Sequence, residues 1–195
     1  MKSPRSEKAR MAATVRAILT LALLLCVSGS VVRAAAFQQD PLSEKDIEKV
    51  RDARDQPNER IKLYTKFIDE RIATIKDLTG KDLTGKTRAN NRRTQLRDKF
   101  QEFTRLADEL ADNLDTYNTE HADMRKALKD LVAASAKWAP VLSAPANDSV
   151  YDFYRGTAVE AAQSVNDQAK KLQGEQDKYF AEHKDQRGKN GTGPD

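Results

Sequence analysis

The sharpest chemical pattern in this 195-residue chain is a match to the phosphate-binding loop. Residues 80–87 read GKDLTGKT and fit G-x-x-x-x-G-K-S/T, in which backbone amides surround a phosphate, the lysine reaches it and the hydroxyl binds magnesium. That chemistry needs a buried strand before the loop, whereas the residues before Gly80 have helical periodicity. The pentapeptide DLTGK also occurs twice in succession, at 77–81 and 82–86. We therefore interpret the match as a duplicated helix-ending turn.

His121 and Met124 are the second candidate pair, because they lie three residues apart on one predicted helix face. An imidazole and a thioether can ligate haem iron or copper between the helices of a bundle. The only other histidine, His183, lies near the C-terminal end. A polar residue that fixes helix register, followed by a core methionine, explains the pair without a ligand. We expect no metal and no cofactor, and keep a haem- or metal-binding bundle as the alternative.

Catalytic sets are not recognisable in the sequence. The only cysteine, Cys26, lies in the N-terminal segment, so a chain that loses this segment has no thiol. Disulfides, thiolate catalysis, cysteine-ligated zinc and iron–sulfur clusters are then excluded. No Ser-His-Asp or Cys-His set can be identified, and the many surface carboxylates do not single out an acid–base pair. The sequence therefore predicts a protein that is not an enzyme.

Residues 1–36 have the organisation of a secretory signal peptide. A cationic stretch precedes the apolar run 17–27, and Ala34 and Ala36 occupy the −3 and −1 positions before Phe37. This predicts export to the periplasm or the extracellular space. The apolar run is shorter than the roughly 20 residues needed to cross a bilayer, so we expect no transmembrane span in the mature protein. An uncleaved anchor and lipidation at Cys26 remain alternatives.

The charge of the chain is divided between the leader and the body. The whole chain carries +4, but the leader holds six basic residues and one acidic residue, which leaves 28 basic and 29 acidic residues in the body. A nearly neutral exported body does not predict nucleic-acid binding. Within the body, residues 81–105 contain eight basic and three acidic side chains, whereas residues 106–123 contain six acidic side chains and no Lys or Arg.

This polarised stretch has two interpretations. The basic half can hold anionic envelope material such as lipid headgroups or cell-wall polymer, and Asp108, Asp112 and Asp115 can weakly gather divalent cations. Alternatively, the two halves pair with each other in an antiparallel dimer, or they are solvated faces. Tyr151 and Phe153 belong to an aromatic cluster with Tyr154 and Trp138, which is either a docking surface or helix-end packing.

Helical periodicity is clearest in the middle of the chain. Apolar residues recur at alternating spacings of four and three from Leu96 to Trp138, as on one face of a helix. Asn113 and Thr119 are poor helix formers and could mark a hairpin, yet the stripe keeps its phase across them. We therefore predict one continuous helix over residues 88–138.

Three further helices flank the central one. We expect the first over residues 44–55, opened by a capping box of Ser43 and Asp46, and the second over residues 58–79 after Pro57. Pro140 and other loop formers predict a loop over residues 139–147. Ser149 then opens a helix over residues 149–185. The helical domain spans residues 37–186, and residues 187–195 should be a disordered tail.

These elements predict an all-α fold, an elongated antiparallel and coiled-coil-like bundle with one long central helix. The stripe is longer than the second helix can cover, so we expect self-association or an envelope protein partner along it. The predicted function is that of an exported interaction or scaffold protein of the cell envelope or periplasm. Its predicted interaction seam consists of Leu96, Phe100, Phe103, Leu110, Leu114, Tyr117, Met124, Leu128, Leu131 and Trp138.

Overall fold

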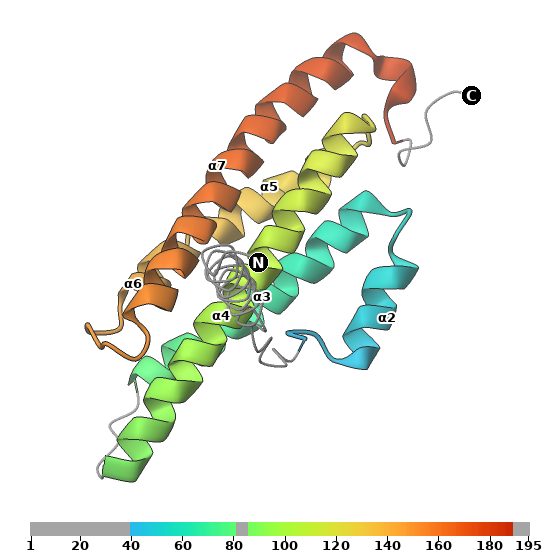
Figure 1. Ribbon diagram of the computed structural model, residues 1–195. Helices are drawn as coiled ribbons and strands as arrows, with labels where there is room; N and C mark the ends of the chain where they lie inside the picture. Colours follow the sequence, from blue (N-terminus) through green and yellow to red (C-terminus); the bar gives the residue numbers. More distant parts are fainter. Residues whose placement is uncertain (1–39, 81–85, 189–195) are drawn as a thin grey trace, which may run out of the picture. The chain divides into compact units, whose positions relative to one another are not determined.

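The computed structural model describes residues 40–80 and 86–188. The predicted leader, with its cleavage positions Ala34 and Ala36, lies outside these residues, as does segment 189–195. Within them no helix is both long enough and apolar enough to cross a membrane. The elements, shown in Figure 1, are α2 (Glu44–Asp52), α3 (Pro57–Gly80), α4 (Lys86–Thr119), α5 (Arg125–Ser135), α6 (Trp138–Ser143), α7 (Asp152–Glu182) and the 3-10 turn η1 (Lys184–Gln186).

The described residues form helices and contain no strand, which confirms the all-α prediction. Helices α3 and α7 each pack against α4, α5 and α6, so α3 and α7 occupy opposite corners of a four-cornered bundle. Helix α4 takes the third corner, and α5 and α6 together take the fourth. The short helix α2 packs against α3. The apolar stripes of all four corners therefore meet in one core, as in other helical bundles.

Ser43 caps the first helix as the sequence predicts. Its hydroxyl accepts a hydrogen bond from the backbone N–H of Asp46 at 3.3 Å and donates one to the Asp46 carboxylate at 2.6 Å. The predicted start of the last helix at Ser149 is wrong. Helix α7 begins at Asp152, three residues after Ser149, and the Asp152 carboxylate accepts a hydrogen bond from the backbone N–H of Asp148 at 2.9 Å. The loop before α7 is therefore longer at its C-terminal side than predicted.

The continuous helix predicted over residues 88–138 is wrong, because α4 ends at Thr119. His121 takes a left-handed backbone conformation with φ of 54°. Its N–H donates to the carbonyl of Asn118 at 3.1 Å, and the N–H of Ala122 donates to the carbonyl of Tyr117 at 2.9 Å. This pair of bonds is the Schellman motif that ends helices. The buried Ala122 and Tyr117 supply the apolar contact that accompanies it.

The start of α5 is capped by side chains from other corners of the bundle. The Asn58 amide of α3 donates to the carbonyl of Asp123 at 2.7 Å and accepts from the N–H of Ala127 at 3.0 Å. Gln176 of α7, which is 3% exposed, accepts from the N–H of Met124 at 3.2 Å. These bonds satisfy backbone groups that a helix start otherwise leaves unpaired. The break is thus stabilised by residues far away in sequence.

A second break separates α5 from α6. Pro140 lacks a backbone N–H, and its ring would clash with the carbonyl four residues earlier if the helix were continuous. The chain therefore leaves the helix at residues 136–137 and starts again at Trp138, which places Pro140 in the first turn of α6, where proline is tolerated. The loop predicted over residues 139–147 is wrong over its first half, because α6 extends to Ser143.

The C-terminal segment folds back on the turn between α4 and α5. The Arg187 side chain donates to the carbonyl of Phe180 at 2.8 Å, and the N–H of Gly188 donates to the Asp123 carboxylate at 3.0 Å. Two residues of the predicted tail, 187 and 188, are therefore placed by these bonds. The hydrogen bond from Arg125, with that from Gly188, holds the pKa of Asp123 below its ordinary value despite its partial burial.

The left-handed position at the end of α4 provides a stability test. We expect His121→Val to be less stable than His121→Gly by about 1–2 kcal/mol, because a β-branched residue is strained at positive φ whereas glycine is not. Both variants lose the imidazole ring, so their difference isolates the backbone. Urea unfolding with a common slope measures it. Equal midpoints would show that the turn does not impose this conformation.

Candidate functional site

All ten residues of the predicted interaction seam are buried in the core of the same chain. None of them is more than 6% exposed, and their neighbours in the core come from α3 and α7. The stripe is divided between α4, α5 and α6, and each part of it is covered by α3 and α7 of the same chain. The mismatch in length that suggested self-association along the stripe therefore does not exist. These ten residues therefore offer no exposed surface to a partner.

His121 and Met124 do not form a joint ligand pair. The turn places His121 on the surface, whereas Met124 is fully buried at the start of α5. The expectation that they share a helix face is wrong because the helix ends between Thr119 and His121. Among the described residues, no three His, Cys, Asp or Glu side chains are grouped so that they could hold a metal ion.

The structure brings His183 to a place that sequence spacing does not indicate. The Tyr179 ring is stacked on His121 at 4.7 Å and on His183 at 4.3 Å between ring centroids. In the described residues no third His, Cys, Asp or Glu is grouped with the two imidazoles so that a metal ion could be held. The stack attaches the C-terminal end of α7 to the turn after α4.

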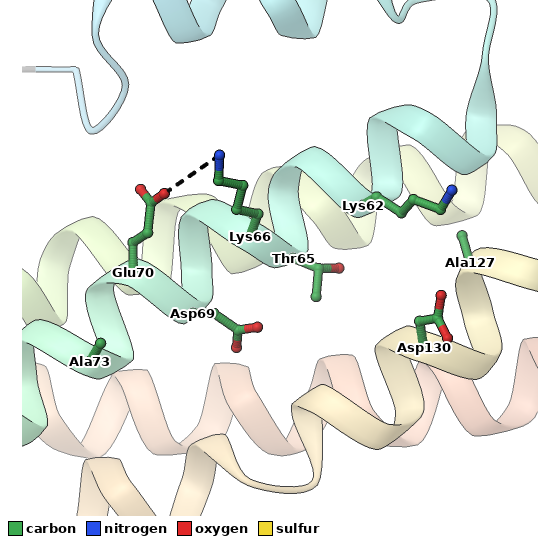
Figure 2. A pocket seen from close by; sticks show the side chains of 8 residues that line it. All are labelled: Lys62, Thr65, Lys66, Asp69, Glu70, Ala73, Ala127 and Asp130. Carbon is green, nitrogen blue, oxygen red and sulfur yellow. Dashed lines mark ion pairs between the residues drawn. The ribbon is translucent and has the colours of Figure 1, made fainter.

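A groove of about 500 Å³ runs between α3 and α5 (Figure 2). Thr65, Asp69 and Asp130 extend into it from the two helices, whereas Lys66 and Glu70 form an ion pair of 4.0 Å on the outer side of α3. Asp69 accepts a 2.7 Å hydrogen bond from the indole N–H of Trp138. Asp69, one of the carboxylates of the groove, therefore stabilises a side chain of the core. The complete lining is Lys62, Thr65, Lys66, Asp69, Glu70, Ala73, Ala127 and Asp130.

The carboxylates on α4 do not form a cation site in the described part of the chain. Partial burial, with the neighbouring Asp112 adding to it, raises the pKa of Asp108. Asp115 accepts a 2.7 Å hydrogen bond from the Gln168 side chain of α7. Asp108 and Asp112 therefore act on each other as like charges, and Asp115 is bonded to the neighbouring helix. The phosphate-loop match falls mostly on residues 81–85, outside the described ones, and Gly80 before it ends a helix, which is not the strand that such a site needs.

The basic residues gather at the other end of α4. Residues 86–97 contain five Lys or Arg and no acidic residue, whereas residues 106–119 contain four acidic residues and no basic one. A helix carries partial positive charge at its N-terminus and negative charge at its C-terminus. Arg88 in the first turn therefore lies at the positive end, and α4 has neither an acidic residue in its first turn nor a basic one in its last. This charge order opposes the helix dipole.

Apolar side chains are exposed at the same end of the bundle. Phe153, in the first turn of α7, is 78% exposed, and its ring meets that of Tyr154 edge to face at 5.4 Å. Val150 in the preceding loop is 37% exposed. A groove of about 370 Å³ separates the last turns of α3 from α6 and is lined by Lys76, Thr79, Gly80, Pro140, Val141 and Ala144.

The loop before α7 is fixed to α4. Asp148 forms a 2.7 Å ion pair with Arg93, and the buried Tyr151 packs its ring 5.8 Å from that of Phe100. Arg155 donates to Asn147 at 2.7 Å and also to the carbonyl of Pro145. Phe153 therefore follows a segment that is fixed to α4 at Arg93 and Phe100. We name this region the basic end: the last turns of α3, residues 86–97, α6, the loop 144–151 and the first turn of α7 (Figure 1).

Comparison with family models, curated proteins and solved structures finds no match for this chain. The geometry of the chain itself is therefore the basis for its proposed function. The sequence indicated both parts of the basic end, namely the charge of residues 81–105 and the aromatic cluster at Tyr151 and Phe153. It did not show that they lie together. The aromatic residues that the sequence grouped together differ in burial: Tyr151 and Trp138 are buried, whereas Phe153 faces solvent.

The two carboxylates of the α3–α5 groove should differ in their effect on stability. We expect Asp69→Ala to lower the free energy of unfolding by about 1–3 kcal/mol, because it leaves the buried indole N–H of Trp138 without its partner. Asp130→Ala, an exposed position on the facing wall, serves as the control and should change stability by less than about 0.5 kcal/mol. Thermal or urea unfolding measures both. Similar values for the two variants would contradict the structural role of Asp69.

Proposed function

We propose that this chain is an exported, non-enzymatic interaction protein of the cell envelope that attaches to an anionic partner through its basic end. The observation that carries the proposal is the reversed charge order of α4. Cations in the first turn of a helix each cost about 0.3–1 kcal/mol when exposed. A chain whose only requirement was folding would gain from the opposite order. The arrangement is instead suited to attracting anions. Local arrangements that are unfavourable for folding occur most often at functional sites.

Several neighbouring features strengthen the positive potential at this end. Helices α4 and α7 both begin there, so the positive ends of two helix dipoles point the same way. Arg88 and Arg93 are exposed on α4. The far half of α4 is acidic, which gives an approaching polyanion a single favourable orientation.

The remaining parts of the proposal rest on the sequence and on the pockets. Export is supported by the cationic, apolar and small-residue order of residues 1–36. A binding role without catalysis is supported by the groove linings, because neither groove pairs a nucleophile with a histidine base among the described residues. The haem- or metal-binding alternative loses its basis with the separation of His121 from Met124.

Charge reversal at the basic end should weaken binding to polyanions. For Arg88→Glu, we expect at least a fivefold loss of affinity for dextran sulfate or for phosphatidylglycerol vesicles, on the basis of about 1 kcal/mol for each basic residue near an anionic surface. The matched control is Lys129→Glu, which changes the charge equally at an exposed position of α5 outside the basic end. Cosedimentation and titration at several salt concentrations measure the affinities. Equal losses in the two variants would refute the proposed location.

The same region provides a test that separates function from folding. Arg88→Glu alone should raise the free energy of unfolding by about 0.3–1 kcal/mol, because it places an anion in the first turn of α4. It should also weaken polyanion binding. For this one variant, the free energy of unfolding should therefore increase while the affinity for polyanions decreases. A loss of stability would show that Arg88 has a structural role and would remove the argument for a functional surface.

A further inference from the structure

A small pocket lies where the end of α4 and the turn after it meet the last third of α7. Its volume is about 210 Å³, and its lining contains no aliphatic residue and consists of Asn118, His121, Glu175, Gln176 and Tyr179. Pockets that hold drug-sized ligands measure roughly 300–1,000 Å³. A ligand of this pocket is therefore small, and polar and aromatic groups surround it.

Gln176 carries a hydrogen-bond donor that the protein does not use. The residue is 3% exposed, and its side-chain oxygen accepts from the N–H of Met124 at 3.2 Å. This bond fixes the orientation of the amide. The NH2 group of the same amide donates to none of the described residues, although the side chain lines the pocket. Because a buried donor without a partner destabilises a fold, the free NH2 group favours an acceptor in the pocket.

Two more side chains of the pocket are available for hydrogen bonds. The Asn118 amide and the His121 imidazole form no side-chain hydrogen bond with the described residues, and both line the pocket. An amide offers donors and an acceptor, and a neutral imidazole offers one of each. Glu175 adds a carboxylate, which is half exposed and lies 3.8 Å from the ammonium of the exposed Lys171. The pocket therefore presents donors and acceptors side by side.

The aromatic wall of the pocket is held in position by the fold. The Tyr179 ring is stacked on His121 and His183, and its hydroxyl donates to the Gln186 side chain at 2.6 Å. His121 is placed by the left-handed turn after α4. A wall that is fixed before the ligand arrives loses little conformational entropy on binding.

The chemistry of the lining narrows the class of ligand. An anion is disfavoured, because Glu175 lines the pocket and α4 ends beside it with the negative end of its dipole and no basic residue in its last turn. No group of three His, Cys, Asp or Glu in the described residues could hold a metal ion. Hydroxyl groups both donate and accept, which suits neighbouring amides and a carboxylate. The C–H groups of a sugar ring can pack against an aromatic ring.

We propose that this pocket binds one neutral sugar ring, either a free monosaccharide or the terminal unit of a glycan. The free NH2 groups of Gln176 and Asn118 donate to the oxygens of the sugar, and Glu175 accepts from one of its hydroxyls. His121 and Tyr179 provide the aromatic contact. Each of these side chains comes from α4, α7 or the turn after α4.

The sugar site goes beyond the proposed function, because it is separate from the basic end. Asn118 lies thirty residues after Arg88 on the same helix, which corresponds to about 45 Å. Arg88→Glu should therefore leave sugar binding unchanged. Failure of sugar binding with polyanion binding intact would overturn the sugar site alone, and the opposite result would overturn only the basic end.

Side-chain amide resonances in ¹H–¹⁵N NMR spectra of the full chain test the site directly. The probes are glucose, galactose, mannose and N-acetylglucosamine at millimolar concentrations. We expect at least one of them to shift the NH2 resonances of Gln176 and Asn118 in a saturable way. The resonance of Gln163, an exposed amide thirteen positions before Gln176 on α7, should not move. No saturable shift with any of the four sugars would overturn the proposal.

Asn118→Ala should weaken binding of the responding sugar about fivefold, as expected for the loss of one neutral hydrogen bond. Its unfolding midpoint should not change, because the amide has no partner among the described residues. Gln163→Ala is the matched control and should change neither quantity. An unchanged affinity in Asn118→Ala would place the sugar elsewhere and overturn the site.

Gln176→Glu tests the buried donor. The variant keeps an oxygen for the N–H of Met124 and replaces the NH2 group by a second oxygen. We expect it to abolish sugar binding, while near-ultraviolet circular dichroism of Trp138 checks that the core is intact. A folded variant that binds the sugar normally would overturn the assignment of Gln176. If the variant does not fold, Asn118→Ala decides.

Further probes separate the classes and sources of ligand. Glucuronate should bind at least fivefold more weakly than glucose because of Glu175, and ethanolamine should not compete with the sugar. Tighter binding of either compound than of the neutral sugars would assign the pocket to a charged ligand and overturn the proposal. A methyl glycoside that binds as well as the free sugar supports a glycan end, whereas a methyl glycoside that does not bind supports a free monosaccharide.

Discussion

The bundle depends on the hydrogen bonds that satisfy the backbone where α5 begins. A buried N–H without a partner costs about 1–3 kcal/mol, and the turn would bury such groups in the core. Asn58 from α3 and Gln176 from α7 remove that cost. The fold-back of the chain after Thr119 is therefore stabilised by the packing of those two helices. Closure of the turn and closure of the bundle stabilise each other, and together they enclose the apolar stripe.

Enclosing the stripe moves any binding role to the surface and the ends of the bundle. The two ends differ in chemistry. One carries the stack of His121, Tyr179 and His183 with the acidic half of α4. The other carries exposed Arg88 in the first turn of α4 and exposed Phe153 in the first turn of α7. This second end contains cations at a positive helix end and an apolar ring in water, neither of which aids folding.

The predicted seam shows that helical spacing identifies buried residues but does not determine whether a helix is continuous. All ten residues are buried, as their three-and-four spacing indicates, because that spacing selects one face of any helix. The same spacing gave the wrong continuity, and it did not show that the stripe is covered by helices of the same chain. Tyr117 and Met124 are seven residues apart, so the phase survives a turn between them. The residue in the left-handed position is histidine instead of the glycine that usually marks a helix end, and the groups that cap α5 lie more than fifty residues away.

By itself the sequence determined the helical class, the buried face of each helix, the cap at Ser43 and the polarity of charge along α4. Each of these follows from interactions between residues a few positions apart, which spacing records directly. Only the tertiary structure decided that the stripe is covered within one chain, that His121 separates from Met124, and that the loop before α7 is fixed to α4. These outcomes depend on which helix packs against which, and that choice is made by long-range contacts such as Asn58 to Ala127 and Arg93 to Asp148.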